Sequence, residues 1–342
     1  MKQFLIPQEG QFFKANLHCH STISDGALTP AEMKAAYQKR GYSVICYTDH
    51  DILVPHPELT EDGFLALYGV EYAVTENTGG EEVPFDRRKT CHICLIALDP
   101  DYTVQPCFNR SWYYDHLEDK SVVRYDKSLP EYVYTYTPEC INDIIQTARD
   151  KGYFVTYNHP AWSLEGYQIY SQYHGMHAME ICNYGCIMEG YHDYNPEVYD
   201  EMLRNGEKIF CIATDDNHNG YPMDSPYCDS FGGFTMIKAE KLDYHTITDA
   251  LLKGNFYASQ GPEIYSLYVE NNKIHIRTSD AKRIVFTTGI RHGFCQYPLA
   301  GGYVNEAEFE LREDDGYVRV TVFDENGKPA NTNAYFTEDI LQ

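Results

Sequence analysis

The sequence is short of basic residues, and this shortage limits what it can bind. Its 342 residues include 27 Lys and Arg against 51 Asp and Glu, which gives a formal net charge of −24. Proteins hold long nucleic acids by neutralising many phosphates with Lys and Arg, so we expect no extended nucleic-acid surface. A short nucleotide is not excluded, because bound divalent metals supply local positive charge.

Long apolar runs and a cysteine framework are also missing. No stretch approaches the roughly 18–20 apolar residues of a membrane span, and the first ten residues hold too short an apolar run for a secretory signal. The eleven cysteines are odd in number and scattered along the chain. They indicate reduced thiols, so we expect a cytoplasmic protein without a membrane span. Cys91 and Cys94 match C-x-x-C, but on the strand that their segment predicts they would face opposite sides, which argues against a zinc ribbon.

The chain repeats one order of signals, in which a capped helix and a glycine precede an apolar run that ends in a candidate ligand. Thr29-Pro30-Ala31-Glu32 predicts a capping box with proline at the first helical position, and Gly41 ends that helix. The order recurs after Thr137, after Asn195 and near Asp243. Short apolar runs predict strands at 13–17, 42–48, 64–70, 93–98, 153–157, 178–182, 208–214 and 234–237.

Alternating strands and helices predict an α/β fold with a mostly parallel sheet. Candidate ligands gathered at strand ends favour a (β/α) barrel, whose active site lies on that face. An open doubly wound sheet is the competitor, but no glycine-rich phosphate loop follows a strand. We therefore expect a barrel domain at 1–261, followed at 262–342 by a small antiparallel β domain of short alternating runs and turns. An insertion at 100–136, rich in Tyr, Trp and Arg, either covers the active site or packs onto the barrel or another subunit.

Two pairs of potential metal ligands carry the chemistry. His18 and His20 are separated by one residue, so an extended strand points both imidazoles to one side and turns Cys19 away. Asp216 and His218 repeat this spacing almost two hundred residues later. Single histidines at predicted strand ends add to these pairs at positions 50, 92 and 159. A lone histidine is more often a packed or surface residue than a ligand, but the combination indicates a transition-metal site.

The motifs together resemble the PHP (polymerase and histidinol phosphatase) family across residues 12–260. They are His18-x-His20-Ser21, Ser24-Asp25-Gly26, Thr48-Asp49-His50-Asp51, Gly69-Val70-Glu71, His92, Asn158-His159-Pro160 and Asp216-x-His218. The resemblance implies a distorted, seven-stranded, TIM-like (β/α) barrel that holds two or three divalent metals. The implied ligands are His18, His20, Asp25, His50, Glu71, His92, His159, Asp216 and His218. Asp25 stands where some relatives carry a histidine. The segment 256–262 and the β-rich tail are also similar to the CehA/McbA-like subgroup.

Six histidines and three carboxylates suit Mn, Fe or Zn and disfavour the all-oxygen sites of Mg or Ca. We expect hydrolysis of a phosphate monoester or diester, small-molecule or nucleotide, by a metal-bound hydroxide. Glu71 is the expected bridging carboxylate, and Asp49 is a candidate proton donor to the leaving group. Candidate substrate residues are Arg87, Arg88 and Lys89, whose alternative is a solvated basic loop, together with Glu180 and Asn183.

Two other functional classes stay open. An amidohydrolase-type barrel also begins with H-x-H and would hydrolyse a carboxyl ester, amide or carbamate. Against it stand the second paired motif, Asp216-x-His218, and the lack of a lysine at a strand end that would bridge metals. A non-catalytic metal-binding module is the other class, and the full set of ligands argues against it. The expected partner is a small phosphorylated molecule.

Overall fold

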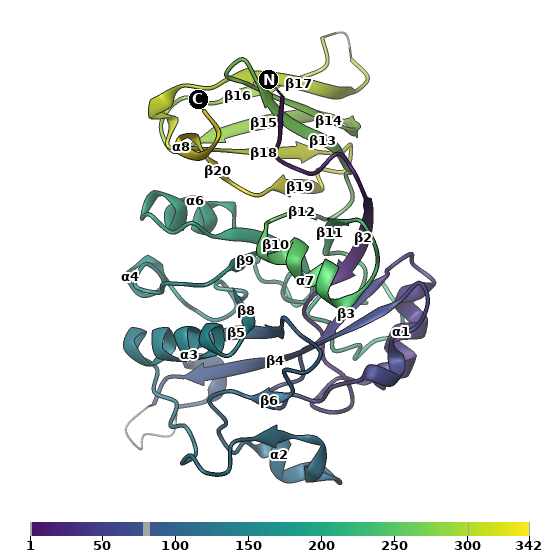
Figure 1. Cartoon of the computed structure of the whole chain (residues 1–342), viewed down its shortest axis with the longest axis vertical. Coiled ribbons are helices and arrows are strands. Elements are labelled where there is room, and N and C mark those ends of the chain that lie inside the picture. Colours follow the sequence, from purple (N-terminus) through teal and green to yellow (C-terminus); the bar gives the residue numbers. More distant parts are fainter. Residues whose placement is uncertain (1, 78–82, 300, 342) are drawn as a thin grey trace.

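The computed structural model describes residues 2–77, 83–299 and 301–341. The chain forms a mixed α/β structure around one large mixed sheet. Figure 1 shows the β-rich part at one end of the molecule, together with both chain termini, and helix α2 (Trp112–His116) at the opposite end. The predicted fold class, α/β with a β-rich tail, is confirmed at this level.

Seven strands follow one another in the order β10-β9-β8-β5-β4-β3-β2. Neighbours are parallel except at β5, which is antiparallel to both β4 and β8. The large sheet is therefore mixed and not mostly parallel as predicted, because its strands beyond these seven all pair in antiparallel fashion. Even these seven include one reversed strand that sequence patterns did not reveal. The strands are Gln11–Asn16 (β2), Val44–Tyr47 (β3), Leu65–Thr75 (β4), Thr90–Ala97 (β5), Tyr153–Tyr157 (β8), Ala178–Asn183 (β9) and Phe210–Thr214 (β10).

The two outer strands of this series, β2 and β10, approach each other beyond their ends. Within the described residues no ladder joins them, but Cys19 and Asn217 form a single parallel bridge. His20 N donates to Asn217 O at 3.1 Å, and Asp216 N donates to His18 O at 2.9 Å. The bridge brings the two ligand-bearing pairs of the sequence side by side.

The helices begin and end where the capping signals predict. In α1 (Pro30–Gln38), Thr29 and Glu32 form the reciprocal capping box, and Gly41 follows with a φ of +78°. No helix among the described residues is long and apolar enough to cross a membrane. The other helices are Pro138–Asp150 (α3), Tyr167–Tyr170 (α4), Tyr184–Met188 (α5), Pro196–Arg204 (α6), Tyr244–Leu252 (α7) and Thr337–Ile340 (α8), with 3₁₀ turns at Pro57–Leu59, Phe85–Arg87, Lys120–Val122 and Glu313–Asp315.

The strands that follow residue 262 pair only in antiparallel fashion. They are not separate from the first part of the chain, because β19 continues the large sheet beside β12 and β1 pairs with β13. The insertion adds the short pair β6 and β7. The remaining strands are Gln3–Phe4 (β1), Val104–Gln105 (β6), Arg124–Tyr125 (β7), Phe234–Ala239 (β11), Phe256–Ser259 (β12), Ile264–Glu270 (β13), Lys273–Ala281 (β14), Arg283–Thr288 (β15), Phe294–Gln296 (β16), Val304–Glu310 (β17), Tyr317–Phe323 (β18), Pro329–Thr332 (β19) and Tyr335–Phe336 (β20).

The main core lies between the seven-strand series and its helices. Apolar residues of these strands and of α3, α6 and α7 form one continuous buried cluster. A second cluster fills the space between the two sheets of the β-rich tail. All eleven cysteines are free thiols, as the sequence predicted. A well-packed core of this size fixes strand ends firmly, and the candidate ligands project from those ends.

Candidate metal centre

The two paired motifs, His18-x-His20 and Asp216-x-His218, lie next to each other just beyond the ends of β2 and β10. His18 and His20 are buried, and Cys19 turns into a separate apolar cluster. The bridge at Asn217 places Asp216 beside this histidine pair. The alternation expected of an extended strand is confirmed for residues 18–20.

Glu71, on β4, lies at the middle of the histidines and is fully buried. Its two oxygens face different sets of rings. Oε1 lies near His92 Nδ1 (3.0 Å), His159 Nε2 (3.1 Å) and His18 Nε2 (3.2 Å), whereas Oε2 lies near His50 Nδ1 (2.9 Å) and His20 Nε2 (3.4 Å). Burial raises the pKa of Glu71, but the nearby imidazoles outweigh burial and hold this pKa well below its ordinary value.

Asp216 is the second buried carboxylate of the centre. Its Oδ1 lies 2.9 Å from His20 Nε2 and 3.1 Å from His18 Nε2. The backbone has a φ of +49° at Asp216 and +26° at His159. Non-glycine residues pay about 1–3 kcal/mol for such conformations, which concentrate at functional sites. The fold therefore holds both side chains in strained positions that aim them at the same point.

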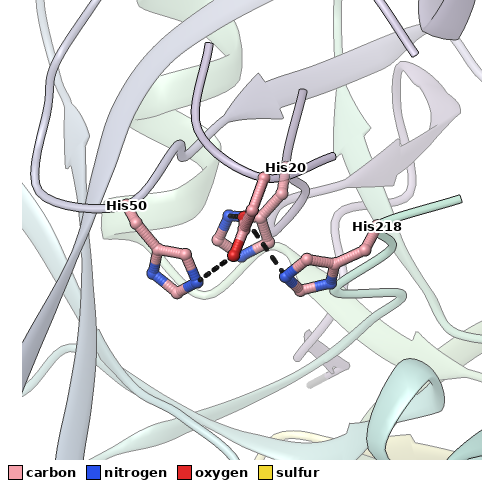
Figure 2. Close-up of side chains that lie close together, drawn as sticks. His20, His50 and His218 are labelled. Carbon is pink, nitrogen blue, oxygen red and sulfur yellow. Dashed lines mark ion pairs between the residues drawn. The ribbon is translucent and has the colours of Figure 1, made fainter. Parts of the chain in front are cut away.

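A third group lies closer to solvent and includes Asp25, which is half exposed. The rings of His50 and His218 stand on either side of His20, as Figure 2 shows, with ring centroids 4.2 and 4.3 Å from that of His20. Asp25 lies 3.5 Å from His218 Nε2 and 3.7 Å from His50 Nε2. The structure thus brings together all nine side chains that the family resemblance implies as ligands.

His92 reaches this cluster in an unexpected way. The sequence placed it at a strand end, but it is the third residue of β5, near the beginning of that strand. Because β5 runs antiparallel to its neighbours, its beginning lies at the edge where β8 ends: Asn158 N donates to His92 O at 3.1 Å. The reversal of β5 therefore brings His92 to the same edge as the other ligand candidates.

The donor atoms fit divalent transition metals. Four of them are buried and have no hydrogen-bond partner in the described part of the chain: His20 Nδ1, Glu71 Oε2, His92 Nε2 and Asp216 Oδ1. An unsatisfied buried polar atom costs about 1–3 kcal/mol, and cations would satisfy these nitrogens and oxygens together. The atoms also gather within 4.8 Å of one another in several groups of three or four.

Burial and the neighbouring carboxylates also set the pKa values of the histidines in this centre. Burial lowers the pKa of His92 to about 4, which leaves a neutral ring with a free lone pair. Burial also lowers the pKa of His20, but the nearby carboxylates of Asp216 and Glu71 raise it to about 10. The carboxylates therefore attract positive charge to this point strongly, in the form of protons or of metal ions.

A cavity of about 290 Å³ opens directly onto the cluster. Sequence reasoning missed most of its wall. It placed Tyr113 only within the aromatic insertion, it passed over Trp162 two residues beyond the Asn158-His159-Pro160 motif, and nothing in the sequence singled out Glu189. The cavity is lined by Asp25, His50, Asp51, Glu71, Ala73, Phe85, His92, Tyr113, His159, Trp162, Gly185, Cys186, Glu189, Asp216 and His218.

The insertion at 100–136 serves both of the purposes that the sequence left open. Tyr113 of α2 lies against the centre: its hydroxyl donates to Asp25 Oδ2 at 2.9 Å, and its ring stacks on His50. Tyr114 is instead buried in an apolar cluster with Phe108 and other residues. The insertion is therefore anchored by a small apolar cluster that it shares with Ile52 and Val54, and it presents one aromatic ring to the cavity.

The predicted proton donor lies outside this cavity. Asp49 is buried, and its Oδ1 accepts hydrogen bonds from Ser21 N at 2.8 Å and from Ser24 N at 3.1 Å. Both serine hydroxyls also donate to it. A carboxylate engaged by four donors has no route to a leaving group. Its evident task is to hold the 21–25 loop, which carries Asp25, against β3.

The predicted phosphate clamp is also absent from the cavity wall. Arg87 and Lys89 are exposed, and the guanidinium of Arg88 lies over the ring of Phe85. Phe85, rather than any of the three basic residues, lines the cavity. The segment contributes an apolar face to the site, and the alternative of a solvated basic loop fits Arg87 and Lys89.

Among known proteins, no family model matches the chain. Its structure is similar to that of a two-domain Bacteroides vulgatus protein described as containing a PHP-like metal-dependent phosphoesterase, with 16% identity, a TM-score of 0.43 and coverage of 98% of this chain and 97% of that chain. A Bifidobacterium adolescentis protein described as a metal-dependent phosphoesterase has 15% identity and a TM-score of 0.39, and the match covers 64% of this chain and 91% of the other.

Two further proteins are similar over part of the chain. An amidohydrolase from Chromobacterium violaceum, with bound sulfate and no metal, has 18% identity and a TM-score of 0.36 over 63% of this chain and 93% of that chain. A 5'-3' exoribonuclease from Haemophilus influenzae is 36% identical over 90 residues, which are 25% of this chain and 32% of the exoribonuclease. The chain thus matches about a third of the length of that relative. Similarity to the CehA/McbA-like subgroup stays a prediction.

Behind the ligand candidates, Glu180 organises the centre without lining the cavity. It is fully buried on β9, and so is Asn183, so these two weak candidates for substrate contact lie behind the ligand candidates. Glu180 Oε1 lies 2.7 Å from His18 Nδ1, a distance at which the ring N–H donates to the carboxylate. That proton position leaves the Nε2 lone pair directed at Glu71 and Asp216. Glu180 also accepts from Thr214 Oγ1 (2.6 Å), His159 N (3.0 Å) and Asn183 Nδ2 (2.9 Å).

We expect Glu180→Gln to weaken metal binding about 10–100-fold, because an amide cannot fix the tautomer of His18 as a carboxylate does. The measurement is competition between the protein and a chelator of known affinity. Glu180→Asp, which keeps the charge, is expected to recover part of the affinity. Equal affinities for the wild type and Glu180→Gln would mean that the carboxylate only fills space.

Proposed function

We propose that this chain is a metal-dependent hydrolase of phosphate esters. The observation that carries the proposal is the convergence of nine histidine and carboxylate side chains, with unpartnered donor atoms among them, at the inner end of a cavity. His18, His20, Glu71 and Asp216 would hold one ion, and Glu71, His92 and His159 a second. A third would lie among His20, Asp25, His50 and His218.

The geometry of Glu71 supports a centre with more than one ion. Its Oε1 faces three histidines and its Oε2 faces two others. One carboxylate with its oxygens directed at different ligand sets is suited to bridging two cations. When bound, divalent ions lower the pKa of a water molecule and neutralise charge on a phosphoryl group. The nitrogen-rich donor set favours Mn, Fe or Zn.

The chain's own residues supply orientation and shielding. Glu180 fixes the tautomer of His18, and Asp49 fixes the loop of Asp25. Tyr113 and Trp162 flank the ligand rings and limit access of water to the cavity. Positioning of this kind accounts for much of the catalysis of phosphoryl transfer, because the protein has little covalent chemistry to perform.

We also propose that the seven strands from β2 to β10 form a distorted barrel, interrupted by the reversed β5. The bridge between Cys19 and Asn217 supports it, since it joins the first and last of these strands at the ligand-bearing edge.

The 90-residue similarity to an enzyme described as a 5'-3' exoribonuclease adds support for phosphodiesters as one substrate class.

Metal content is the first test. Protein purified without chelators is expected to contain about two or three equivalents of Mn, Fe or Zn per chain, since four overlapping groups of donors share His18, His20, His50 and Glu71. Elemental analysis of the purified protein measures this directly. Less than one equivalent in a folded and active preparation would contradict a multinuclear centre.

The reaction is assigned by a substrate panel. We expect metal-loaded protein to hydrolyse phosphate monoesters or diesters, and to lose activity on chelation and regain it on re-addition of metal. The panel includes carboxyl esters of the same alcohols as the phosphate esters. The amidohydrolase-type alternative predicts attack on the carbonyl carbon of these carboxyl esters. A preference for carboxyl esters would replace the proposed function with that alternative.

A further inference from the structure

The wall of the metal cavity carries an unusual set of charges for an enzyme that acts on phosphates. Three carboxylates belong to the candidate centre, and two more, Asp51 and Glu189, lie on the wall. All 27 Lys and Arg of the chain lie in the described residues, and none of them lines this cavity. Positive charge for the substrate must therefore come from the metals alone.

A simple count shows how much charge is available. Asp25, Glu71 and Asp216 carry −3, and two or three divalent ions would carry +4 or +6, which leaves roughly +1 to +3. Asp51 and Glu189 reduce this surplus further. The remainder suits a single phosphoryl group, and a second phosphate on the same substrate would meet carboxylates and no cation.

Aromatic rings form the rest of the wall, on two sides of the centre. On one side, Tyr113 stacks on His50 with ring centroids 5.3 Å apart. On the other, the indole of Trp162 packs in T-shaped contacts with His92 and His159, with ring centroids 5.2 and 5.1 Å apart. These rings come from separate segments of the chain, so their convergence belongs to the cavity rather than to one local motif.

Glu189 adds a polar function beside the indole. Its Oε2 accepts a hydrogen bond from Trp162 Nε1 at 3.0 Å, and the residue lies exposed at the rim. This bond fixes the ring plane of Trp162. The other oxygen of Glu189 is available to accept a hydrogen bond from an amino or hydroxyl group of a ligand.

We infer that the substrate is an ester with a single phosphoryl group and a planar ring, which binds between Tyr113 and Trp162 and presents hydrogen-bond donors to Glu189. This inference rests on the proposed function and narrows its substrate class. Planar rings stack on aromatic side chains regardless of their exact chemistry. Substrates with a second phosphate, and long polyanions such as RNA, are disfavoured by the carboxylates of the wall.

The two tryptophans of the chain allow a binding test that does not depend on turnover. Trp112 is 64% exposed and does not line the cavity, so Trp112→Phe leaves Trp162 as the sole indole reporter. The protein is loaded with Zn²⁺ and titrated with phenylphosphonate, butylphosphonate and 1,4-phenylenediphosphonate. We expect phenylphosphonate to quench Trp162 and to bind about tenfold more tightly than butylphosphonate. The diphosphonate is expected to bind about tenfold more weakly than phenylphosphonate.

Matched variants identify the residues responsible. Calorimetric titration of Trp162→Leu is expected to show a phenyl-to-butyl affinity ratio near one, whereas Trp112→Leu keeps the wild-type ratio. Equal affinities for phenyl and butyl ligands in the wild type, or tighter binding of the diphosphonate, would overturn the inference. The protein could also bind phenylphosphonate selectively and yet hydrolyse neither phenyl phosphate nor any other phosphate ester of the panel. That result would reject the proposed function but not the inferred binding of a planar ring.

Discussion

Glu71→Gln is expected to lower kcat/KM for phosphate esters by about 10³-fold or more and to remove at least one metal equivalent. The carboxylate faces both histidine sets with separate oxygens, at distances of 3.0 Å from His92 Nδ1 and 2.9 Å from His50 Nδ1. Glutamine keeps the volume but replaces one oxygen with an NH₂ group. That group cannot coordinate a cation and would direct hydrogens at ring nitrogens. The loss therefore falls on the centre itself and not on packing.

A second buried glutamate offers a matched control for this change. Glu165 accepts hydrogen bonds from the hydroxyls of Tyr136, Tyr157 and Tyr173 and does not line the metal cavity. Glu165→Gln makes the same chemical substitution in a buried place outside the centre. We expect its metal content to match the wild type and its kcat/KM to stay within a fewfold. Elemental analysis and steady-state kinetics of both variants measure the metal content and kcat/KM. Similar losses of metal and of kcat/KM in the two variants would contradict the proposed role of Glu71.

The local parts of this structure could be predicted because local signals decide them. Thr29-Pro30-Ala31-Glu32 contains both halves of its capping box, and the helix begins there. The strand at Tyr153–Tyr157 and the alternation of His18, Cys19 and His20 follow from β-prone residues and a period of two. The full set of nine candidate ligands, with Asp25 among them, was instead implied by the resemblance of short motifs in or near these strands to the PHP family.

What could not be predicted depends on contacts between distant segments. The reversal of β5 is a matter of pairing with β4 and β8, and no pattern inside residues 90–97 encodes its direction. Glu180 was only a weak candidate for the pocket because it follows an apolar run, and its contact with His18, 162 residues away, could not be read from the sequence. Asp49 is similar, because its partners Ser21 and Ser24 lie on another loop.

The cavity wall shows this limit most clearly. Basic residues near a predicted strand suggested a phosphate clamp, but the sequence does not reveal that Arg87 and Lys89 are exposed and that Arg88 lies over the ring of Phe85. Phe85 occupies that position instead, and aromatic residues of the insertion and of the loop after His159 complete the wall. Which rings pack and which remain free depends on tertiary packing, as the contrast between Tyr113 and its buried neighbour Tyr114 illustrates.

The second large effect is expected at the contact between α6 and the β-rich tail, where a buried ion pair joins the two. Arg319 on β18 donates from Nε and from a terminal nitrogen to the two oxygens of Asp200 on α6, both at 2.7 Å. Tyr317 Oη donates to the same carboxylate at 2.9 Å. The side chains of the ion pair are 5% and 12% exposed, so little water is present to compensate for the loss of either partner.

We expect Arg319→Met to lower the free energy of unfolding by about 3–5 kcal/mol, because it leaves the charge of Asp200 buried without its counter-ion. The double variant Arg319→Met with Asp200→Leu removes both charges and is expected to recover most of this loss, since the pair itself adds little net stability over apolar packing. Arg277→Met, at an exposed strand position, is the control and is expected to change stability by no more than about 0.5 kcal/mol. Urea unfolding curves of the four proteins measure these differences. A double variant as unstable as Arg319→Met alone would mean that the guanidinium acts through packing, and that charge compensation does not hold the tail to α6.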